Sequence, residues 1–510
     1  MKRDGTLESL WQSEITVHGH ENDVDNTDID VVIVGAGITG VTCALNLQKK
    51  GFDCMIIEAA HMGYGTTSGT TAHLNNFFDA SYDVVITDFG LDAAKLLAQA
   101  AGEALEIIHG NIVEFNIDCD YLPRTAYLFS VDGKQEKILD DLVEGSRKAG
   151  IEINEADKNP FDMIPCTKVV EIPGQAQFHP IKYIKGLMDE YGKGGGRFVE
   201  GCRVAGVEKE GDHLVVSTEQ GNIVCDHVIY ATHLPPGKNI MHFRNAPYRS
   251  YVVALKLKDN NYPQALGYDL YEAYHYYRTH VINGEEYLIA GGEDHKTGDI
   301  ENTNECFERL VNYVGRYFDI ERVAYKWSSQ FYQSADGLPY IGHLPGSPDN
   351  VYCATGYTGN GMIFGTLAAK TLSDLVATGD SIYKKLFDPA RVKPLASFTN
   401  FVKEGADVVK HLLFDRFSVD KIRTLAALEN GQGKVVNYEG YSLAVYKDDA
   451  GKEYILQSDC THLHCTVKWN SEEKSWDCPC HGSRFGINGE VLTGPAVKKL
   501  KNILAENDIS

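Results

Sequence analysis

The sequence has no long apolar run and no excess of positive charge. No apolar run reaches the roughly 18 residues that a membrane-spanning helix needs, and the first residues, MKRDGTLESLWQSE, lack the apolar segment of a secretory signal. The 48 lysine and arginine residues are outnumbered by 71 aspartate and glutamate residues, so the formal net charge is −23. This balance argues against binding to nucleic acid or to an anionic membrane surface, because both require clustered positive charge. We therefore expect a cytoplasmic protein without a membrane span.

Internal repeats are also absent, and 510 residues are too many for one compact core. Shifts in composition predict a loosely ordered polar arm, a large domain of alternating helices and strands, a helical connector and a small β domain, over residues 1–27, 28–388, 389–429 and 430–510 respectively. In the large domain we expect a helix over 91–109 and strands over 204–216 and 228–230. In the small domain we expect strands over 434–436, 442–446 and 454–457.

Cysteine is frequent but unevenly placed. Eight of the 12 cysteines are scattered, which is typical of small buried residues in an intracellular protein. The other four lie between positions 460 and 481 together with three histidines, in the spacings Cys460-x-His462 and Cys478-x-x-His481. Zinc sites usually pair C-x₂₋₄-C with H-x₃₋₅-H or with a second C-x₂-C, so zinc is the less favoured alternative. Two cysteines on one iron and two histidines on the other describe a Rieske [2Fe-2S] centre.

A glycine-rich turn stands near the beginning of the large domain. A β-branched strand at 29–34 runs into Gly35-x-Gly37-x-x-Gly40, which opens a helical stretch, and a second strand at 53–57 ends at Glu58. The first glycine allows the tight turn, the second lets a pyrophosphate approach the backbone, and the third lets helix and strand pack closely. The order predicts a dinucleotide site with the phosphates at the helix N-terminus and a ribose hydroxyl on Glu58. A glycine-rich turn without a ligand is the alternative.

Four further segments recur in a fixed order along the large domain. They are Gly63-Tyr-Gly-Thr-Thr-Ser-Gly69, Val228-Ile-Tyr-Ala-Thr232, Asp336-Gly-Leu-Pro-Tyr-Ile-Gly342 and Ala354-Thr-Gly-Tyr-Thr-Gly-Asn-Gly361-Met362. With these, residues 28–388 resemble the flavoprotein superfamily of D-amino-acid oxidase and glycine/sarcosine oxidase. The resemblance implies an α/β Rossmann-like FAD-binding domain with an interleaved α+β substrate domain. It implies that FAD is bound by Gly35, Gly37, Gly40, Glu58, Gly65, Thr66, Thr67, Ser68, Val204, Gly359, Asn360, Gly361 and Met362.

The same resemblance bears on how the flavin is held. In the sarcosine-oxidase branch a cysteine bonds the flavin covalently, and the aligned position in the segment Trp327–Asp336 is Ser329. Because the thiol is missing, noncovalent FAD is expected. His73 is a candidate for covalent attachment, with a structural role as the alternative.

Residues 430–505 resemble Rieske domains, with Cys460, His462, Cys478 and His481 as the implied ligands of one [2Fe-2S] cluster. In the respiratory members of that family the cysteines that match Cys465 and Cys480 form a disulfide. For this chain a reduced pair of thiols remains the alternative. Ser483 matches a serine that donates to the cluster, whereas Phe485 replaces a tyrosine donor, so a lower potential than the respiratory type is expected. His464 stands where the family motif usually has a glycine.

The two parts together resemble bacterial fusions of a glycine-oxidase-like flavoprotein with a C-terminal Rieske domain. The implied function is oxidation of a C–N bond of a small amine or amino acid by hydride transfer to FAD, with electrons passed on singly through the cluster to an acceptor protein or quinone. Candidate residues for the substrate wall are Tyr251, Tyr271, Tyr274, His275, Tyr277, Gln333 and His343.

Three other functions remain as alternatives. A pyridine-nucleotide-driven reductase would need a second dinucleotide fold, but no second G-x-G-x-x-G follows a strand. A Rieske oxygenase would need two histidines and a carboxylate around a lone iron, and Glu293-Asp-His295 offers one histidine. A redox sensor without catalytic activity is the third alternative.

Overall fold

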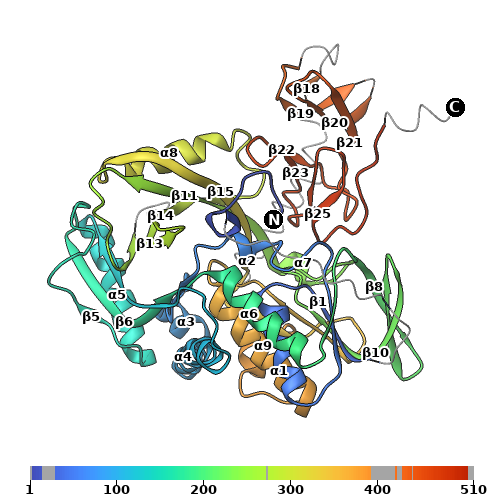
Figure 1. Ribbon diagram of the computed structural model, residues 1–510, viewed down its shortest axis with the longest axis horizontal. Helices are drawn as coiled ribbons and strands as arrows, with labels where there is room; N and C mark the ends of the chain where they lie inside the picture. Colours follow the sequence, from blue (N-terminus) through green and yellow to red (C-terminus); the bar gives the residue numbers. More distant parts are fainter. Residues whose placement is uncertain are drawn as a thin grey trace.

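The computed structural model describes residues 3–13, 24, 29–270, 274–391, 420–421, 428–438 and 440–503. Most of the expected connector, most of residues 14–28 and the candidate Tyr271 therefore lie outside the described residues. Figure 1 shows a large domain with a smaller domain, drawn in orange and red, seated on one of its sides. No helix in the described ranges is both long enough and apolar enough to cross a membrane.

The first sheet of the large domain has eight strands in the order β16-β17-β10-β1-β2-β7, with β9 beside β10 and β8 beside β9. The strands are β1 (Ile29–Val34), β2 (Cys54–Ile57), β7 (Arg197–Val199), β8 (Val204–Glu210), β9 (His213–Thr218), β10 (Gly221–Tyr230), β16 (Tyr340–His343) and β17 (Val351–Thr355). β1 pairs in parallel with both β2 and β10. Since parallel strands covered on both faces are apolar throughout, the β-branched run at 29–34 belongs at the centre of this sheet.

The second sheet has nine strands in the order β15-β11-β14-β13-β12-β4-β6-β3, with β5 beside β6. The strands are β3 (His73–Leu74), β4 (Leu122–Ser130), β5 (Asn154–Glu155), β6 (Lys168–Gln177), β11 (Asn245–Leu257), β12 (Leu266–Asp269), β13 (Tyr276–Ile282), β14 (Glu285–Lys296) and β15 (Ile320–Ser334). Its strands alternate along the chain with those of the first sheet, so the two sheets are interleaved. This arrangement confirms the predicted fold class.

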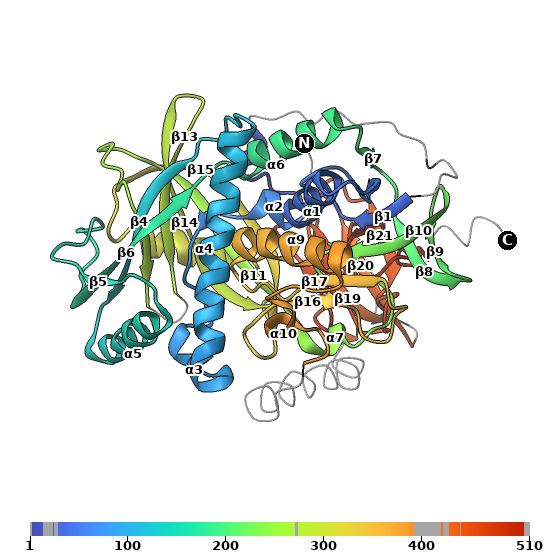
Figure 2. The same cartoon turned by 90° about the horizontal axis from the view of Figure 1, so that it is seen from below.

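Helices cover the sheets and bring the glycine-rich turn into place. They are η1 (Leu10–Ser13), α1 (Ile38–Lys49), α2 (Thr66–Gly69), α3 (Tyr82–Phe89), α4 (Leu91–Glu114), α5 (Gly133–Ala149), α6 (Pro180–Lys193), α7 (Met241–Arg244), α8 (Asn304–Val314), α9 (Gly361–Thr378) and α10 (Lys384–Phe387). α9 packs against both α1 and α4, as Figure 2 shows. The helix predicted over 91–109 is confirmed as α4.

The small domain consists of two four-stranded sheets, ordered β18-β19-β20-β21 and β22-β23-β24-β25. The strands are β18 (Asp420–Lys421), β19 (Gly433–Tyr438), β20 (Tyr441–Lys447), β21 (Glu453–Gln457), β22 (Lys468–Asn470), β23 (Ser475–Asp477), β24 (Arg484–Phe485) and β25 (Val491–Thr493). The three strands expected here from alternation are confirmed as β19, β20 and β21. The cysteine and histidine pairs lie in the loops that precede β22 and β24.

Residues 3–13 differ from the loosely ordered arm expected for them. The guanidinium of Arg3 forms an ion pair with Glu473 of the small domain at 2.7 Å, and Asp4 pairs with Arg484 at 2.8 Å. All four side chains are buried. The partners of these charges come from strands and turns more than 450 residues away, so local composition carried no sign of them.

Candidate functional site

A cavity of about 570 Å³ opens where the glycine-rich turn meets the second sheet. Its lining comes from both sheets of the large domain and also from residues 492–497 of the small domain. Gly35 holds a φ of +109°, and a Cβ at this position would lie 2.6 Å from the carbonyl oxygen of Ala231. Only glycine fits such a turn, which leaves the start of α1 open toward the cavity.

Glu58 stands at the end of β2, on the same side of the cavity. Its carboxylate accepts hydrogen bonds from the backbone N–H of Ala36 and of Ala60, both at 2.9 Å. Burial raises the pKa of this carboxyl in spite of the two donors. The side chain is therefore held at the cavity wall, in the place where the sequence predicts a ribose contact.

The residues predicted to bind FAD gather at this cavity. All of them line it except Gly40 and Ser68. Thr67 Oγ1 accepts from the backbone N–H of Ile38 at 3.2 Å, which joins the loop at 65–69 to the start of α1. The N-terminus of α9 brings Gly361 and Met362 to the opposite wall. A glycine cradle, two helix starts and one carboxylate fit a dinucleotide with a pyrophosphate.

Gly40 acts from behind the cavity, as the third glycine of the motif is expected to do. A Cβ here would collide with the carbonyl oxygen of Gly35, which cannot move without opening the turn. We expect Gly40→Ala to push α1 away from the turn and to weaken FAD binding at least about fivefold, since such overpacking costs about 1–3 kcal/mol. Purified protein should therefore carry less than half of the normal FAD content, measured by absorbance.

The matched control for Gly40 is Gly110→Ala on α4, where the added Cβ meets no atom within 4 Å. This variant should keep its FAD, because alanine favours a helix. Equal FAD content in the two variants would contradict the role assigned to Gly40.

The two positions considered for covalent attachment carry no reactive group toward the cavity. His73 Nδ1 lies 2.9 Å from Thr71 Oγ1, and its Nε2 lies 3.2 Å from the carbonyl oxygen of Tyr277. Burial, followed by the charge of Arg278, lowers the pKa of His73 to about 3, so the ring is neutral with both nitrogens engaged. Ser329 lines the cavity beside Gly69 with a hydroxyl where a thiol would be needed.

Five residues proposed from the sequence for the substrate wall do not line the cavity: Tyr251, His275, Tyr277, Gln333 and His343. Strand phase explains the first three. Ser250 and Val252 line the cavity, so Tyr251 between them points to the other face, where its hydroxyl meets His295 at 2.9 Å.

His275 and Tyr277 show the same effect, whereas Gln333 and His343 lie beyond the segments that line the cavity. His275 is buried against Tyr313 and bonded to Asp269, and Tyr277 lies in the same core, whereas Tyr274 and Tyr276 line the cavity. Gln333 is exposed and lies after the part of β15 that lines the cavity. His343 lies on the edge strand β16, and its Nε2 is hydrogen-bonded to the carbonyl oxygen of Pro348. The wall residues that sequence reasoning missed are Asn75, Asp79, Ser250, Tyr268, Tyr276 and Asp294.

The second site lies in two matching loops of the small domain. In the first, the N–H of Cys460 donates to the carbonyl of Cys465, and the N–H of His464 donates back to the carbonyl of Cys460, both at 2.9 Å. In the second, Cys478 and Ser483 are joined at 2.8 Å, and the N–H of Gly482 donates to Cys478 at 2.9 Å. The fifth residue of each loop has a positive φ, +61° at His464 and +73° at Gly482. His464 therefore occupies a backbone position that favours glycine.

The four predicted ligands lie together in pairs of like chemistry. The thiols of Cys460 and Cys478 are hydrogen-bonded to each other, and both are buried. The rings of His462 and His481 are 5.1 Å apart between centroids and nearly perpendicular. Two sulfurs and two imidazoles are the donor set of a Rieske cluster, in which each pair would hold one iron.

The histidine nitrogens support this assignment. His462 Nε2 lies 3.0 Å from the carbonyl oxygen of Gly237, so this nitrogen carries the proton and the lone pair is on Nδ1. Nδ1 of His462 and both ring nitrogens of His481 are buried without a hydrogen-bond partner. Unpaired buried acceptors are rare unless a ligand completes them. The residues present therefore fit a [2Fe-2S] cluster held through these nitrogens and the two thiols.

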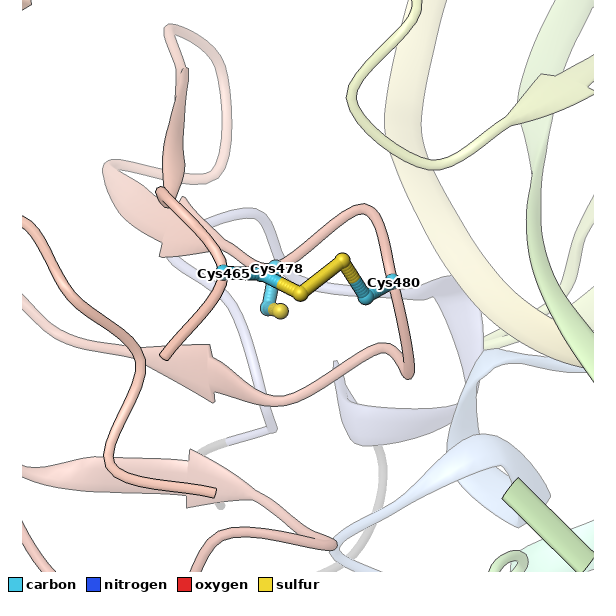
Figure 3. A group of neighbouring side chains, drawn as sticks. All are labelled: Cys465, Cys478 and Cys480. Carbon is cyan, nitrogen blue, oxygen red and sulfur yellow. A yellow bond between two sulfur atoms is a disulfide. The ribbon is translucent and has the colours of Figure 1, made fainter. Parts of the chain in front are cut away.

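Cys465 and Cys480 are joined by a disulfide that links the two loops. Figure 3 shows this disulfide with the side chain of Cys478 beside it. The sulfurs of Cys465, Cys478 and Cys480 all lie within 4.8 Å of one another. This trio has the spacing of a metal site, but two of its sulfurs are already bonded to each other. We therefore assign Cys478 to the cluster and the disulfide to the join between the loops.

Ser483 and Phe485 lie where the sequence places them. The hydroxyl of Ser483 is within hydrogen-bonding reach of Cys460, and it also accepts from the N–H of Ala496 at 3.0 Å. The ring of Phe485 is fully buried and has no donor. One side-chain donor to the sulfurs, rather than two, agrees with the lower potential that we expect.

The cluster loops rest directly on strands of the large domain that line the cavity. Gln330 lines the cavity and donates through Nε2 to the carbonyl of Gly482 at 2.8 Å. Two residues along β15, the hydroxyl of Tyr332 donates to the carbonyl of His481 at 3.0 Å. Thr66, in the predicted flavin loop, donates to the carbonyl of Gln330 at 3.1 Å. The two candidate sites are thus joined by a few hydrogen bonds.

Comparison with known proteins supports both sites. The family described as FAD dependent oxidoreductase matches residues 30–375, and the Rieske [2Fe-2S] domain matches residues 418–504. YhfW from Bacillus subtilis, a Rieske 2Fe-2S iron-sulfur protein by name, is 33% identical over 498 residues, with 97% of each chain covered. Gamma-glutamylputrescine oxidoreductase from Escherichia coli is 26% identical over 365 residues, which cover 68% of this chain and 83% of that protein.

Among solved structures, glycine oxidase from Geobacillus kaustophilus superposes with a TM-score of 0.56 at 19% identity. The match covers 72% of this chain and 99% of the other. At this identity the likeness supports the fold of the large domain alone.

Proposed function

The chain belongs to the FAD dependent oxidoreductase family and carries a Rieske [2Fe-2S] domain, and on this premise we propose that it oxidises a C–N bond of a small amine or amino acid and passes the electrons on singly. When bound, FAD accepts two electrons as a hydride, and the [2Fe-2S] cluster carries one electron at a time. The small domain then serves as the exit from the large one, toward an acceptor protein or a quinone.

The observation that carries this proposal is that both domains meet at one cavity. Residues 492–497 of the small domain help to line it, and β15 contributes both to the lining and to the bonds that hold the loop of His481. Because electron transfer weakens steeply with distance, a cluster loop fixed beside the flavin cavity suits a relay. A purely structural role for the small domain would not require its cluster loops to lie against β15, beside the cavity.

Within the cavity, the protein's own residues position the reactants. The glycine turn and the starts of α1 and α9 would hold the phosphates of FAD through their backbone N–H groups, since these residues line the cavity. The walls from the second sheet enclose the space that remains, so a substrate carbon can be held against the ring while water is excluded. We also propose that FAD is held without a covalent bond, since Ser329 offers no thiol. Acid precipitation should then release all of the FAD into the supernatant.

The acceptor is proposed to approach the small domain from a side away from the large one. The rings of His462 and His481 are covered by the segment that carries Gly237 and His242, whose ring lies 4.4 Å from that of His462. His462 is 7% exposed and His481 1% exposed. A direct docking on these histidines would require the domains to separate.

An anaerobic two-step experiment tests the function. The purified holoenzyme is mixed with a panel of primary and secondary amines and amino acids, and in parallel with NADH. We expect at least one amine to bleach the flavin in the stopped flow, and the reduced cluster signal in EPR to follow. Bleaching by NADH alone would support a pyridine-nucleotide-driven reductase instead. A bleached flavin beside a cluster that stays oxidised would contradict the electron route.

A further inference from the structure

The part of the cavity formed by the second sheet has a lining that the FAD motifs do not account for. Its polar atoms come from Asn75 and Asp79, which follow β3, and from Asp294 on β14. Aromatic rings surround them, with Tyr268 on β12 and Tyr276 on β13. These residues are spread over four segments of the chain, so no motif in the sequence unites them.

Asp294 reaches the cavity because β14 is irregular at this point. β11 and β14 pair Arg249 with His295 and Tyr251 with Gly292, so two residues of β14 lie opposite Ser250 alone. One of the two, Glu293, has a φ of +58°, which is costly for a residue with a side chain. A bulge of this kind turns a side chain out of the regular alternation, and strain retained beside a cavity is typical of a functional site.

Two acceptor atoms on this wall lack a hydrogen-bond donor. Asp294 Oδ1 is buried without a hydrogen-bond partner. Asn75, which is 7% exposed, uses its Nδ2 to donate to Tyr268 at 2.6 Å, which leaves its buried Oδ1 unpaired as well. Asp79 accepts from the N–H of Gly359 at 3.0 Å through Oδ2 and from the hydroxyl of Tyr274 at 3.5 Å through Oδ1. One carboxylate oxygen and one amide oxygen therefore lack donors, and the carboxylate of Asp79 lines the same cavity.

Positive charge is missing from this wall. Among the described residues that line the cavity, Arg203 is the only arginine, and no lysine lines it. Arg203 belongs to the other part of the cavity, next to Val204, and donates to the carbonyl of Val491 at 3.0 Å. A substrate carboxylate on the second-sheet side would thus meet acidic groups and no cation, which disfavours it strongly in a semi-enclosed space.

From this arrangement we propose that the wall of Asn75, Asp79 and Asp294 is a cation subsite, and that the substrate is an aliphatic amine cation without a carboxylate on the carbon that bears the reacting nitrogen. The ammonium N–H groups supply the donors that Asp294 Oδ1 and Asn75 Oδ1 lack, and the carboxylate of Asp79 adds negative charge beside them. The neighbouring rings of Tyr268, Tyr274 and Tyr276 add attraction for a cation through their faces. The inference rests on the proposed function and narrows its substrate class from amines or amino acids to amines.

A matched pair of ligands tests the proposal on the unaltered holoenzyme. Propylamine and L-2-aminobutanoate differ only by a carboxylate on the carbon that bears nitrogen. Their dissociation constants are measured anaerobically from the change in the visible absorbance of the flavin. We expect propylamine to bind at least tenfold more tightly. Equal or tighter binding of the amino acid, or no measurable binding of propylamine, would overturn the proposal.

A variant then tests whether the preference for propylamine depends on the carboxylate of Asp294. Asp294→Asn keeps the shape of the side chain and removes its charge, and we expect it to weaken propylamine binding roughly tenfold to a hundredfold. The affinity for L-2-aminobutanoate should change less than threefold. Glu301→Gln, an exposed acid on the same domain, is the control for net charge and should change neither value. If Asp294→Asn behaves like this control, Asp294 is not part of a cation subsite.

The result is separable from the test of the proposed function. If propylamine shows the expected preference but no amine of the panel bleaches the flavin, the oxidation proposal fails and the cation subsite stands. If amines and amino acids both bleach the flavin with no preference between propylamine and L-2-aminobutanoate, the oxidation stands and the cation subsite fails.

Discussion

Replacing Cys478 with serine is expected to remove the iron–sulfur cluster while FAD stays bound. Cys478 is buried beside Cys460, and its loop is closed by its own backbone bonds to Ser483 and Gly482. A serine hydroxyl is a poor ligand for iron, so one iron would lose half of its protein donors. Losing an outer partner of a ligand already costs ten- to a hundredfold in affinity, and losing the ligand itself should cost more than about 100-fold.

Three measurements check this expectation on the same sample. Iron and acid-labile sulfide should fall from two of each per chain to near zero, and the EPR signal of the reduced cluster should disappear. Bleaching of the flavin by the substrate should remain, whereas reduction of a one-electron acceptor should drop by roughly 100-fold or more. Flavin and cluster thereby become separable functions of one chain.

Cys166→Ser is the matched control, because Cys166 is a free, half-buried cysteine of the large domain. It should retain two irons and full acceptor reduction. A Cys478→Ser protein that keeps its EPR signal would show that this thiol is not a ligand. Acceptor reduction at the normal rate without any cluster would show that electrons leave the flavin by another way.

The cofactor motifs could be predicted because their chemistry is local in the sequence. The glycine turn lies between one strand and one helix, and each pair of cluster ligands lies in one six-residue loop, from Cys460 or from Cys478. Such short segments determine their own geometry from residue types and spacing. The structure accordingly brings nearly all of these residues to the two sites.

The substrate wall could not be predicted in the same way, because it depends on the phase of long strands. In β11, Ser250 faces the cavity and Tyr251 faces a core, and either phase suits a strand that is buried on both sides. Asp294 reaches the cavity through a bulge, which shifts the phase by one residue. Of the candidates on these strands and the turn before them, Tyr274 lines the cavity, whereas Tyr251 and Tyr277 face a core and their neighbours Ser250 and Tyr276 line the cavity instead.

The contacts between the domains were also beyond reach of the sequence. Gly237 offers only a backbone carbonyl to His462, so no side chain marks its role. Gly482 lies under Gln330 and Tyr332, and a Cβ there would come within 2.6 Å of both. A glycine in a cluster loop looks like a turn residue until its neighbour from the other domain is known.

Arg484→Met is expected to destabilise the junction of the two domains more than any surface change. Arg484 is fully buried and forms ion pairs with Asp4 at 2.8 Å and with Asp477 at 3.0 Å. Arg3 and Arg249 pair with the same set of acids, so three arginines balance Asp4, Glu473 and Asp477. Removing one partner of such a buried group leaves carboxylates without compensation, which costs about 3–5 kcal/mol. Urea titration, followed by the visible circular dichroism of the cluster, measures the loss.

The pH dependence gives a second, independent signature of the same network. Burial alone would raise the pKa of Asp4 and of Asp477, but the charges of Arg484 and its neighbours lower both below their ordinary values. These carboxylates therefore stabilise the wild-type fold fully above about pH 4, and this contribution is lost as the pH falls through their lowered values. Without Arg484, burial becomes the dominant effect, and the pKa values of Asp4 and Asp477 are no longer lowered. The difference in stability between wild type and Arg484→Met should then be largest near neutral pH and should shrink below about pH 4.

Arg322→Met is the control for this variant, because Arg322 pairs with Glu285 on the surface, where the two side chains are 47% and 49% exposed. Solvent already screens that pair, so its loss should move the urea midpoint far less and with no comparable change in acid. Equal urea midpoints for the two variants would mean that the buried ion pairs of Arg484 contribute no more to stability than the surface pair does. A larger gap at acid pH than at neutral pH would mean that the acids near Arg484 are not held in their charged form. The expected order follows from burial alone, since the same charge pair is worth more where water cannot reach it.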